Sequence, residues 1–280
     1  MSFLGLSEPV VRLLAFSTIF VILAAVELLA PRLERDEMRG ALKSRRWVTN
    51  LAMVVLSSVA LRIVFPLAAV GTALWAQSEG LGLFPLLGVP VWMAAILAFV
   101  ILDFAVWLEH VVSHKWTWLW RIHRMHHADT GFDLTTALRF HPLEIVLSML
   151  WKAAVIIAIG APPAAVLVFE IVLNGAAMFN HANIRLPKPV DRVLRLLIVT
   201  PDMHRIHHST DPRETDSNYG FNLAIWDRMF STYTQTPRRG DTGIEIGLRE
   251  WRDDRPARLG WALALPFRSA PARRPVDQAD

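Results

Sequence analysis

The sequence contains no cysteine, and this absence excludes a disulfide scaffold as well as zinc and iron–sulfur sites with thiolate ligands. Any bound metal must therefore use nitrogen or oxygen ligands. Charged residues are also few, at 19% of the 280 residues, whereas hydrophobic residues make up 53%. This balance is too apolar for an ordinary soluble domain. The 14 glycines and 17 prolines follow no period, which excludes a collagen-like chain, so we expect a membrane protein.

Four long apolar segments support this expectation, at about residues 10–30, 47–75, 89–108 and 143–180. The first has no basic stretch before it and no clear cleavage site after it, so we expect a retained span rather than a signal peptide. Arg62 and Pro66 in the second segment require a protein-lined or interfacial position. Pro162 and Pro163 divide the fourth segment and predict a helical hairpin whose two ends lie on the same side.

The basic residues predict the orientation of these segments. The loop after the first segment contains six basic residues: Arg32, Arg35, Arg39, Lys43, Arg45 and Arg46. The loop at residues 77–85 contains none, and the polar part from Arg185 onward holds 16 of the 29 lysines and arginines. By the positive-inside rule, the first loop and the C-terminal part are cytoplasmic. Because the basic residues flank apolar segments, they predict membrane orientation, and no nucleic-acid partner is expected.

The domain organisation that follows is one membrane-embedded unit over residues 1–268, with a disordered tail over residues 269–280. The compact chain shows no targeting peptide and no attached electron-transfer domain. We therefore expect the inner membrane of a bacterium as its location.

All ten histidines lie between His110 and His208. Most of them form three short motifs, an H-x-x-x-H and two copies of H-x-x-H-H, which comprise His110 and His114, then His123, His126 and His127, then His204, His207 and His208. On a helix, residues three and four apart share a face, so we expect each H-x-x-H-H motif to aim three imidazoles at one point. Surface or core histidines are a poor explanation for this joint pattern, since many unpaired imidazoles are costly to bury.

The histidine motifs predict a site for two metal ions. They supply eight imidazoles, four for each metal, and His181 is available as a ninth. His141, Asn180 and Asp227 are possible additional ligands or hydrogen-bond partners of ligands, although His141 before Pro142 also fits a helix cap. Iron, copper and zinc all accept imidazole, so the ligand set alone does not choose among them. The predicted fold class is all-α: a polytopic membrane protein whose helical, histidine-rich cytoplasmic cap holds the two metals.

Other residues near the motifs have a second, plainer interpretation. Five aspartates could hold ligand imidazoles by hydrogen bonds, but acidic residues in loops are more often solvated or paired: Asp129, Asp133, Asp202, Asp211 and Asp227. Three tryptophans could line a substrate site, but anchoring at the membrane interface is the preferred interpretation: Trp116, Trp118 and Trp120.

The pattern resembles the fatty acid hydroxylase / sterol desaturase superfamily. The resemblance covers about residues 95–235 and rests on the three histidine motifs together with Asn180-His181, Asn218-Tyr219-Gly220 and Trp226-Asp227. It implies an integral-membrane, O₂-dependent enzyme with two non-haem Fe²⁺ ions, whose cytoplasmic histidine cap lies over a lipid-accessible cavity. Members of the superfamily hydroxylate, desaturate or oxidatively demethylate lipids. Without an attached cytochrome b5-like domain, electrons must come from a separate donor, a ferredoxin or a cytochrome b5-like protein with its reductase.

The expected activity is hydroxylation of a fatty acyl or sterol-like lipid, with desaturation as the alternative. Oxidation of an unactivated C–H bond requires redox-active metals, which zinc is not. A haem-binding electron-transfer protein is a weaker alternative, since haem uses single axial histidines rather than triplets. A divalent-metal transporter is weaker as well, because it requires ionisable ligands near the bilayer midplane, where only Arg62, Lys152 and Glu170 are candidates.

Overall fold

The computed structural model describes residues 2–3, 5–32, 41–241 and 243–269, and this part of the chain is mostly helical. The predicted all-α fold is confirmed, with only a short antiparallel hairpin of β1 (Ser2–Phe3) and β2 (Leu6–Ser7) before the first helix. The predicted tail at residues 269–280 lies outside the described residues apart from Ser269, as do Arg35 and Arg39 of the basic loop.

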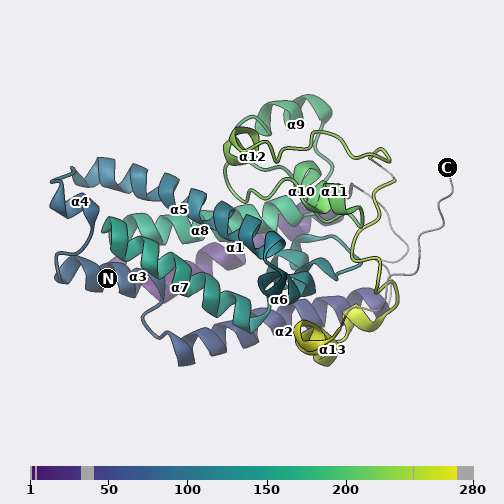
Figure 1. Ribbon diagram of the computed structural model, residues 1–280, viewed down its shortest axis with the longest axis horizontal. Helices are drawn as coiled ribbons and strands as arrows, with labels where there is room; N and C mark the ends of the chain where they lie inside the picture. Colours follow the sequence, from purple (N-terminus) through teal and green to yellow (C-terminus); the bar gives the residue numbers. More distant parts are fainter. Residues whose placement is uncertain (1, 4, 33–40, 242, 270–280) are drawn as a thin grey trace.

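Within the described residues, five helical segments are long and apolar enough to cross a membrane. They are α1 (Glu8–Leu29), the segment Leu42–Leu86, α5 (Val91–Lys115), α7 (Pro142–Ile159) and α8 (Pro163–His181). Figure 1 shows these helices packed along the long axis of the molecule, with most of the shorter helices gathered around one end of the bundle. We call this collection of short helices the cap.

The cap begins with α6 (Thr117–His127) directly after α5 and continues with the 3-10 helix η2 (Leu134–Leu138). After α8 follow α9 (Lys188–Leu194), α10 (Pro201–His207), α11 (Pro212–Thr215) and α12 (Ile225–Met229). The last helices of the described chain are η3 (Arg255–Ala257), α13 (Leu259–Ala264) and η4 (Leu265–Phe267).

The expected second span occupies two helices, α2 (Ala41–Val64) and α3 (Ala68–Ser78). The break lies at Pro66, which has no N–H to donate and whose ring clashes with a preceding carbonyl inside a helix. After the break, α3 continues toward the end of the molecule opposite the cap, where α4 (Leu83–Leu86) lies (Figure 1).

The apolar segment with the two prolines is the helical hairpin α7–α8. Gly160 ends α7 in the left-handed conformation (φ 68°), and Pro163 occupies the first turn of α8, where a missing N–H costs nothing. The turn packs against the loop after α3, because a Cβ at Gly82 would lie 2.1 Å from the backbone nitrogen of Gly160. The hairpin therefore reaches the end of the bundle opposite the cap.

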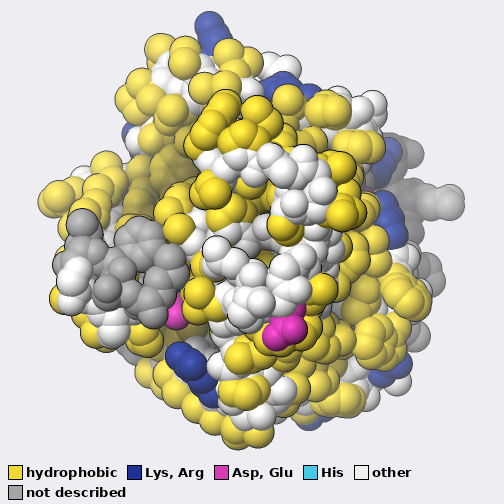
Figure 2. Space-filling model, turned by 90° about the vertical axis from the view of Figure 1, so that its left-hand side faces the viewer, with side chains coloured by type: hydrophobic (Ala, Val, Ile, Leu, Met, Phe, Trp, Pro, Cys, Tyr) yellow, Lys and Arg dark blue, Asp and Glu magenta, His cyan; other side chains and the backbone are white. Residues whose placement is uncertain are grey.

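Small side chains allow these helices to approach closely. Ala69 and Ala73 of α3, Ala98 of α5 and Ala165 of α8 are buried with Phe169 in one core between the helices. The outer surfaces instead expose large hydrophobic side chains such as those of Leu13, Val21, Val55, Ile63 and Ile96. Figure 2 shows the end of the molecule opposite the cap, where hydrophobic side chains dominate. An apolar exterior of this extent suits lipid rather than water.

Candidate metal centre

Four segments of the chain bring nine histidines together where the bundle meets the cap. His110 and His114 lie in the last turns of α5, which continues beyond the expected span end at residue 108. Helix α6 carries His123, His126 and His127, and His181 is the last residue of α8. Helix α10 carries His204 and His207, and His208 is its C-cap. These nine side chains come from segments up to 98 positions apart and are almost all buried.

The histidines divide into two groups that could each hold a metal ion, with their ligand atoms within 4.8 Å of one another in each group. The first group contains five residues: His110, His114, His123, His127 and His207. The second contains four residues: His126, His181, His204 and His208. The expectation that each H-x-x-H-H motif aims three imidazoles at one point was wrong, because each motif contributes to both groups.

Helix geometry explains this division. Successive residues on an α-helix are rotated by about 100°, so the first and last histidines of H-x-x-H-H lie about 40° apart and the two adjacent ones about 100° apart. On α6, His123 and His127 therefore face the first group, and His126 turns to the second. On α10 the assignment is reversed: His204 and His208 face the second group and His207 the first.

The distances between imidazole nitrogens fit ligands around common ions. In the first group, Nε2 of His110 lies 3.1 Å from Nε2 of both His123 and His207, and Nε2 of His127 lies 3.2 Å from that of His123. In the second group, Nε2 of His181 lies 3.2 Å from that of His126 and 3.1 Å from that of His204. With metal–nitrogen bonds of about 2.1 Å, two ligands at a right angle are about 3.0 Å apart.

Hydrogen bonding among the imidazoles does not account for this arrangement. Nε2 of His110 faces two other Nε2 atoms, and so does Nε2 of His181, yet one ring nitrogen makes at most one N–H···N bond as donor or as acceptor. Among the described residues, several buried imidazole nitrogens have no hydrogen-bond partner, including Nδ1 and Nε2 of His208 and Nε2 of His114. Buried polar atoms are normally paired, so these nitrogens fit metal ligands well.

The outer nitrogens of several imidazoles hold the rings in place. Nδ1 of His110 donates to the carbonyl oxygen of Tyr219 at 2.6 Å, and Nδ1 of His207 donates to that of Ser217 at 2.7 Å. Nδ1 of His181 donates to the carbonyl oxygen of Ala177 at 2.7 Å. Only an N–H can donate to a carbonyl, so Nδ1 carries the proton and the lone pair of Nε2 points inward.

His123 has a charged partner that the sequence analysis missed. Its Nδ1 lies 2.5 Å from Oε1 of Glu144 in the first turn of α7. The separation of 21 residues in the chain carries no motif, and only the packing of α6 against α7 brings the two side chains together. A carboxylate in this position orients the ring and raises its basicity as a ligand.

Burial keeps the cap imidazoles neutral. It lowers the pKa of His207 to about 3, although the hydrogen bond to Ser217 opposes the shift. Burial also lowers the pKa of four other imidazoles well below its usual range, and neighbouring histidines add to the effect, at His126, His127, His204 and His208. A neutral imidazole has the free lone pair that a metal needs.

The three remaining candidates lie outside both groups. His141 caps α7, where its Nδ1 accepts from the backbone nitrogen of Leu143 at 3.2 Å. The amide nitrogen of Asn180 donates to the carbonyl oxygen of Phe221 at 3.1 Å. Asp227 accepts from the backbone nitrogens of Tyr219 and Gly220 at 2.9 and 2.8 Å. Asp227 thereby fixes the loop whose Tyr219 carbonyl accepts the hydrogen bond from Nδ1 of His110.

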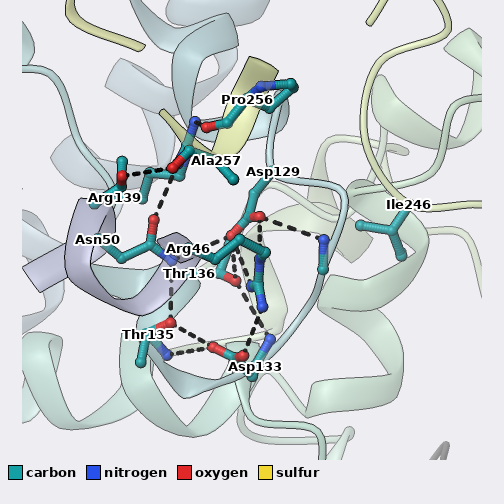
Figure 3. A network of polar contacts seen from close by, with 12 residues as sticks. Arg46, Asn50, Asp129, Asp133, Thr135, Thr136, Arg139, Ile246, Pro256 and Ala257 are labelled. Atoms are coloured by element: carbon teal, nitrogen blue, oxygen red, sulfur yellow. Dashed lines mark hydrogen bonds and ion pairs between the residues drawn. The ribbon is translucent and has the colours of Figure 1, made fainter. Parts of the chain in front are cut away.

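The other aspartates are paired, as the plainer interpretation predicted. Figure 3 shows Arg46 of α2 between Asp129 and Asp133, with N···O distances of 2.6 and 3.0 Å. Burial alone would raise the pKa of Asp129, but the guanidinium of Arg46 holds it at about 2. Asp202 pairs with Arg32 at 2.7 Å, and Asp211 caps α11. Arg32 and Arg46, which the sequence analysis used to predict the membrane orientation, therefore anchor the cap to the bundle.

The tryptophans between the first two motifs differ in their roles. Trp116 and Trp118 are 61% and 55% exposed, which fits membrane anchoring. The ring of Trp120 instead lies 4.9 Å from that of His114 and 5.4 Å from that of His127. Phe140 stacks on His126 at 4.4 Å. Aromatic rings thus cover the imidazoles and keep water away from them.

Comparison with known proteins matches residues 95–232 to the fatty acid hydroxylase family, a range that contains all ten histidines. The chain is 27% identical over 242 residues to ornithine lipid hydroxylase OlsE of Rhizobium tropici, covering 84% of this chain and 72% of the relative. It is 33% identical over 141 residues to alkylglycerol monooxygenase of Xenopus tropicalis, covering 49% of this chain and 30% of the relative. A cholesterol 25-hydroxylase-like protein of Danio rerio is 26% identical over 136 residues, covering 48% of this chain and 52% of the relative. No solved structure matches the chain significantly.

Proposed function

The chain belongs to the fatty acid hydroxylase / sterol desaturase superfamily, as the sequence resemblance predicted, and from this membership we propose a membrane-bound, O₂-dependent, non-haem di-iron lipid hydroxylase. The observation that carries the proposal is the convergence of nine imidazoles into two groups, of five and four residues. Relatives that hydroxylate ornithine lipid and oxygenate alkylglycerol support a lipid as the substrate.

The protein's own residues would hold the metals and exclude water from them. The inward Nε2 atoms are the proposed ligands, and the carbonyls of Ser217 and Tyr219 hold two of the rings in the required tautomer. When bound, a pair of ferrous ions supplies redox chemistry that zinc lacks, the reduction of O₂ and the oxidation of an unactivated C–H bond. Phe140, Trp120 and Phe221 pack on the imidazoles and limit the access of water.

The protein is an integral membrane protein, because five apolar helical segments accompany a family of membrane enzymes. We propose that residues 1–268 form one membrane-embedded unit with the catalytic core at about 95–235, and that the cap is on the cytoplasmic side of a bacterial inner membrane. A separate electron donor, a ferredoxin or a cytochrome b5-like protein with its reductase, would then reach the cap from the cytoplasm.

Metal analysis tests the proposal directly. We would purify the protein in detergent from iron-replete cells, with oxygen excluded and chelators avoided, and measure metal per chain. We expect close to two irons and, in cells that express the protein, lipids that have gained one oxygen. Lipids that have lost two hydrogens would assign desaturation instead. Folded protein without bound metal would overturn the proposal.

Reporter fusions test the orientation. Fusions after Arg46, Gln77 and Arg185 should report inside, outside and inside, because the α7–α8 hairpin returns the chain to the side where it started. An outside signal at Arg185 would contradict the cytoplasmic cap.

A further inference from the structure

Two short helices of the cap expose large apolar side chains that no part of the described chain covers. We call this surface the apolar shelf; it comprises Val190, Val193, Leu196, Leu197, Ile225, Met229 and Phe230. Leu197 and Met229 are 70% and 62% exposed, values unusual for a group of neighbouring apolar residues on the polar part of a protein.

The shelf is one surface, because hydrogen bonds join its two segments. The backbone nitrogen of Ala224 donates to the carbonyl oxygen of Leu197 at 3.0 Å, and Ile198 and Leu223 form an antiparallel bridge. The guanidinium of Arg228 donates to the carbonyl oxygen of Arg195 at 2.6 Å. Helices α9 and α12 therefore lie side by side, as Figure 1 shows above the bundle.

The shelf lies at the depth where α5 leaves a bilayer. The ring of Phe230 stacks on Trp107 at 4.7 Å and on Phe104 at 5.8 Å, both on α5. Trp107 is 16 residues after Val91, where α5 begins, so the helix rises about 24 Å between them. The hydrocarbon core of a bilayer is about 30 Å thick, so Phe230 lies near the boundary between acyl chains and headgroups.

Basic side chains surround the shelf. Lys188, Arg192 and Arg228 are exposed, whereas the acidic Asp191 is buried and paired with Arg195. In Figure 2, which looks along the bundle toward the cap, hydrophobic side chains cover much of the lobe above the bundle, and Lys and Arg side chains lie at its edge. Apolar residues bordered by basic ones are the pattern of a surface that lies in a membrane interface.

We propose that the apolar shelf inserts into the acyl–headgroup boundary of the leaflet on the cap side, with its basic residues on anionic phospholipid headgroups. The shelf continues the apolar surface of α5, so one lipid-facing surface extends from the bundle onto the cap. It also brings the leaflet close to the metal centre, because the segment just before α12 carries Phe221. The ring of Phe221 lies 4.9 Å from that of His110. The proposal depends on the membrane location and not on the reaction.

Cysteine labelling tests the shelf with little interference, since the chain has no native cysteine. We would make Leu197→Cys and Met229→Cys, both exposed positions, with Asp253→Cys as an exposed control in the cap's C-terminal segment. Each variant is labelled with an environment-sensitive fluorophore and placed in vesicles of phosphatidylcholine and phosphatidylglycerol. Lipids with a nitroxide near the headgroup should reduce the fluorescence of the two shelf labels about twofold or more, and that of the control much less.

The opposite pattern would overturn the proposal: strong quenching of the shelf labels by aqueous iodide and none by the nitroxide lipid. Crosslinking of Leu197→Cys between two copies in vesicles, with no lipid quenching, would instead assign the shelf to a protein interface and would also overturn it. A double variant with Lys188 and Arg192 changed to Gln should reduce any increase in quenching with the phosphatidylglycerol fraction.

Discussion

His123 and Glu144 are joined by a short hydrogen bond, 2.5 Å from imidazole Nδ1 to carboxylate Oε1, between the helix that carries one histidine motif and the first turn of the α7–α8 hairpin. This bond links the first group of histidines to a membrane helix. It gives His123 a charged partner, whereas His110 and His207 have backbone carbonyls in the same role. The position of α7 therefore acts directly on the geometry of the metal centre.

Glu144→Gln should weaken iron binding by about tenfold to a hundredfold, because the amide keeps the shape of the side chain but removes the charge that supports the imidazole. Competition with a calibrated chelator measures the change. Glu79→Gln, on the exposed loop at the other end of the bundle, serves as the control and should bind iron like the native protein. Equal affinity for iron in the two variants would mean that Glu144 does not support His123 as a metal ligand.

His126→Ala and His207→Ala should each lose activity, but they should lose different amounts of iron. His126 belongs to the four-residue group, which would retain three imidazoles, so its variant should fall from two irons per chain toward one. His207 belongs to the five-residue group, which would retain four, so its variant should keep more iron while losing activity. His141→Ala is the matched control, since His141 caps α7. Full iron occupancy in His126→Ala would contradict the division into two groups.

Asp227→Asn should lower the stability of the cap. The carboxylate accepts four hydrogen bonds, from the backbone nitrogens of Tyr219 and Gly220, the indole of Trp107 and the hydroxyl of Thr232. An amide nitrogen in place of one oxygen would face N–H donors, at a cost of about 1–3 kcal/mol for each bond lost. Thermal unfolding of the iron-loaded protein measures this loss. The exposed Asp253→Asn should leave the unfolding temperature unchanged.

Gly82→Ala should destabilise the contact between the α3–α5 connection and the hairpin turn. The added Cβ would lie 2.1 Å from the nitrogen of Gly160, and Gly82 has φ +109°, a conformation that alanine rarely adopts. Gly88→Ala is the matched control: it also has a positive φ, +64°, but its Cβ would meet none of the described atoms within 4 Å. We expect a loss of about 1 kcal/mol for the control and a clearly larger loss for Gly82→Ala. Similar losses would show that the hairpin does not pack on this loop.

Local features of the sequence were sufficient to predict the helical fold and the family and to single out the nine histidines. Apolar runs of this length predict long helices because a helix satisfies its backbone hydrogen bonds within the segment itself, as a lipid environment requires. Pro162 and Pro163 predict the hairpin because the same bonds cannot continue through them. The histidine motifs are visible because three- and four-residue spacings bring side chains to one region of a helix, whatever the rest of the chain does.

Only the tertiary structure decided how these histidines are shared. Helical spacing separates His126 from His123 and His127, but which group each of them joins depends on where α5, α8 and α10 lie around α6. The partner Glu144 and the carbonyls of Ser217 and Tyr219 also come from packing between distant segments, and a carbonyl oxygen leaves no trace in the sequence because every residue has one. Spacing along a helix is a local property, whereas a metal centre is built from contacts between helices.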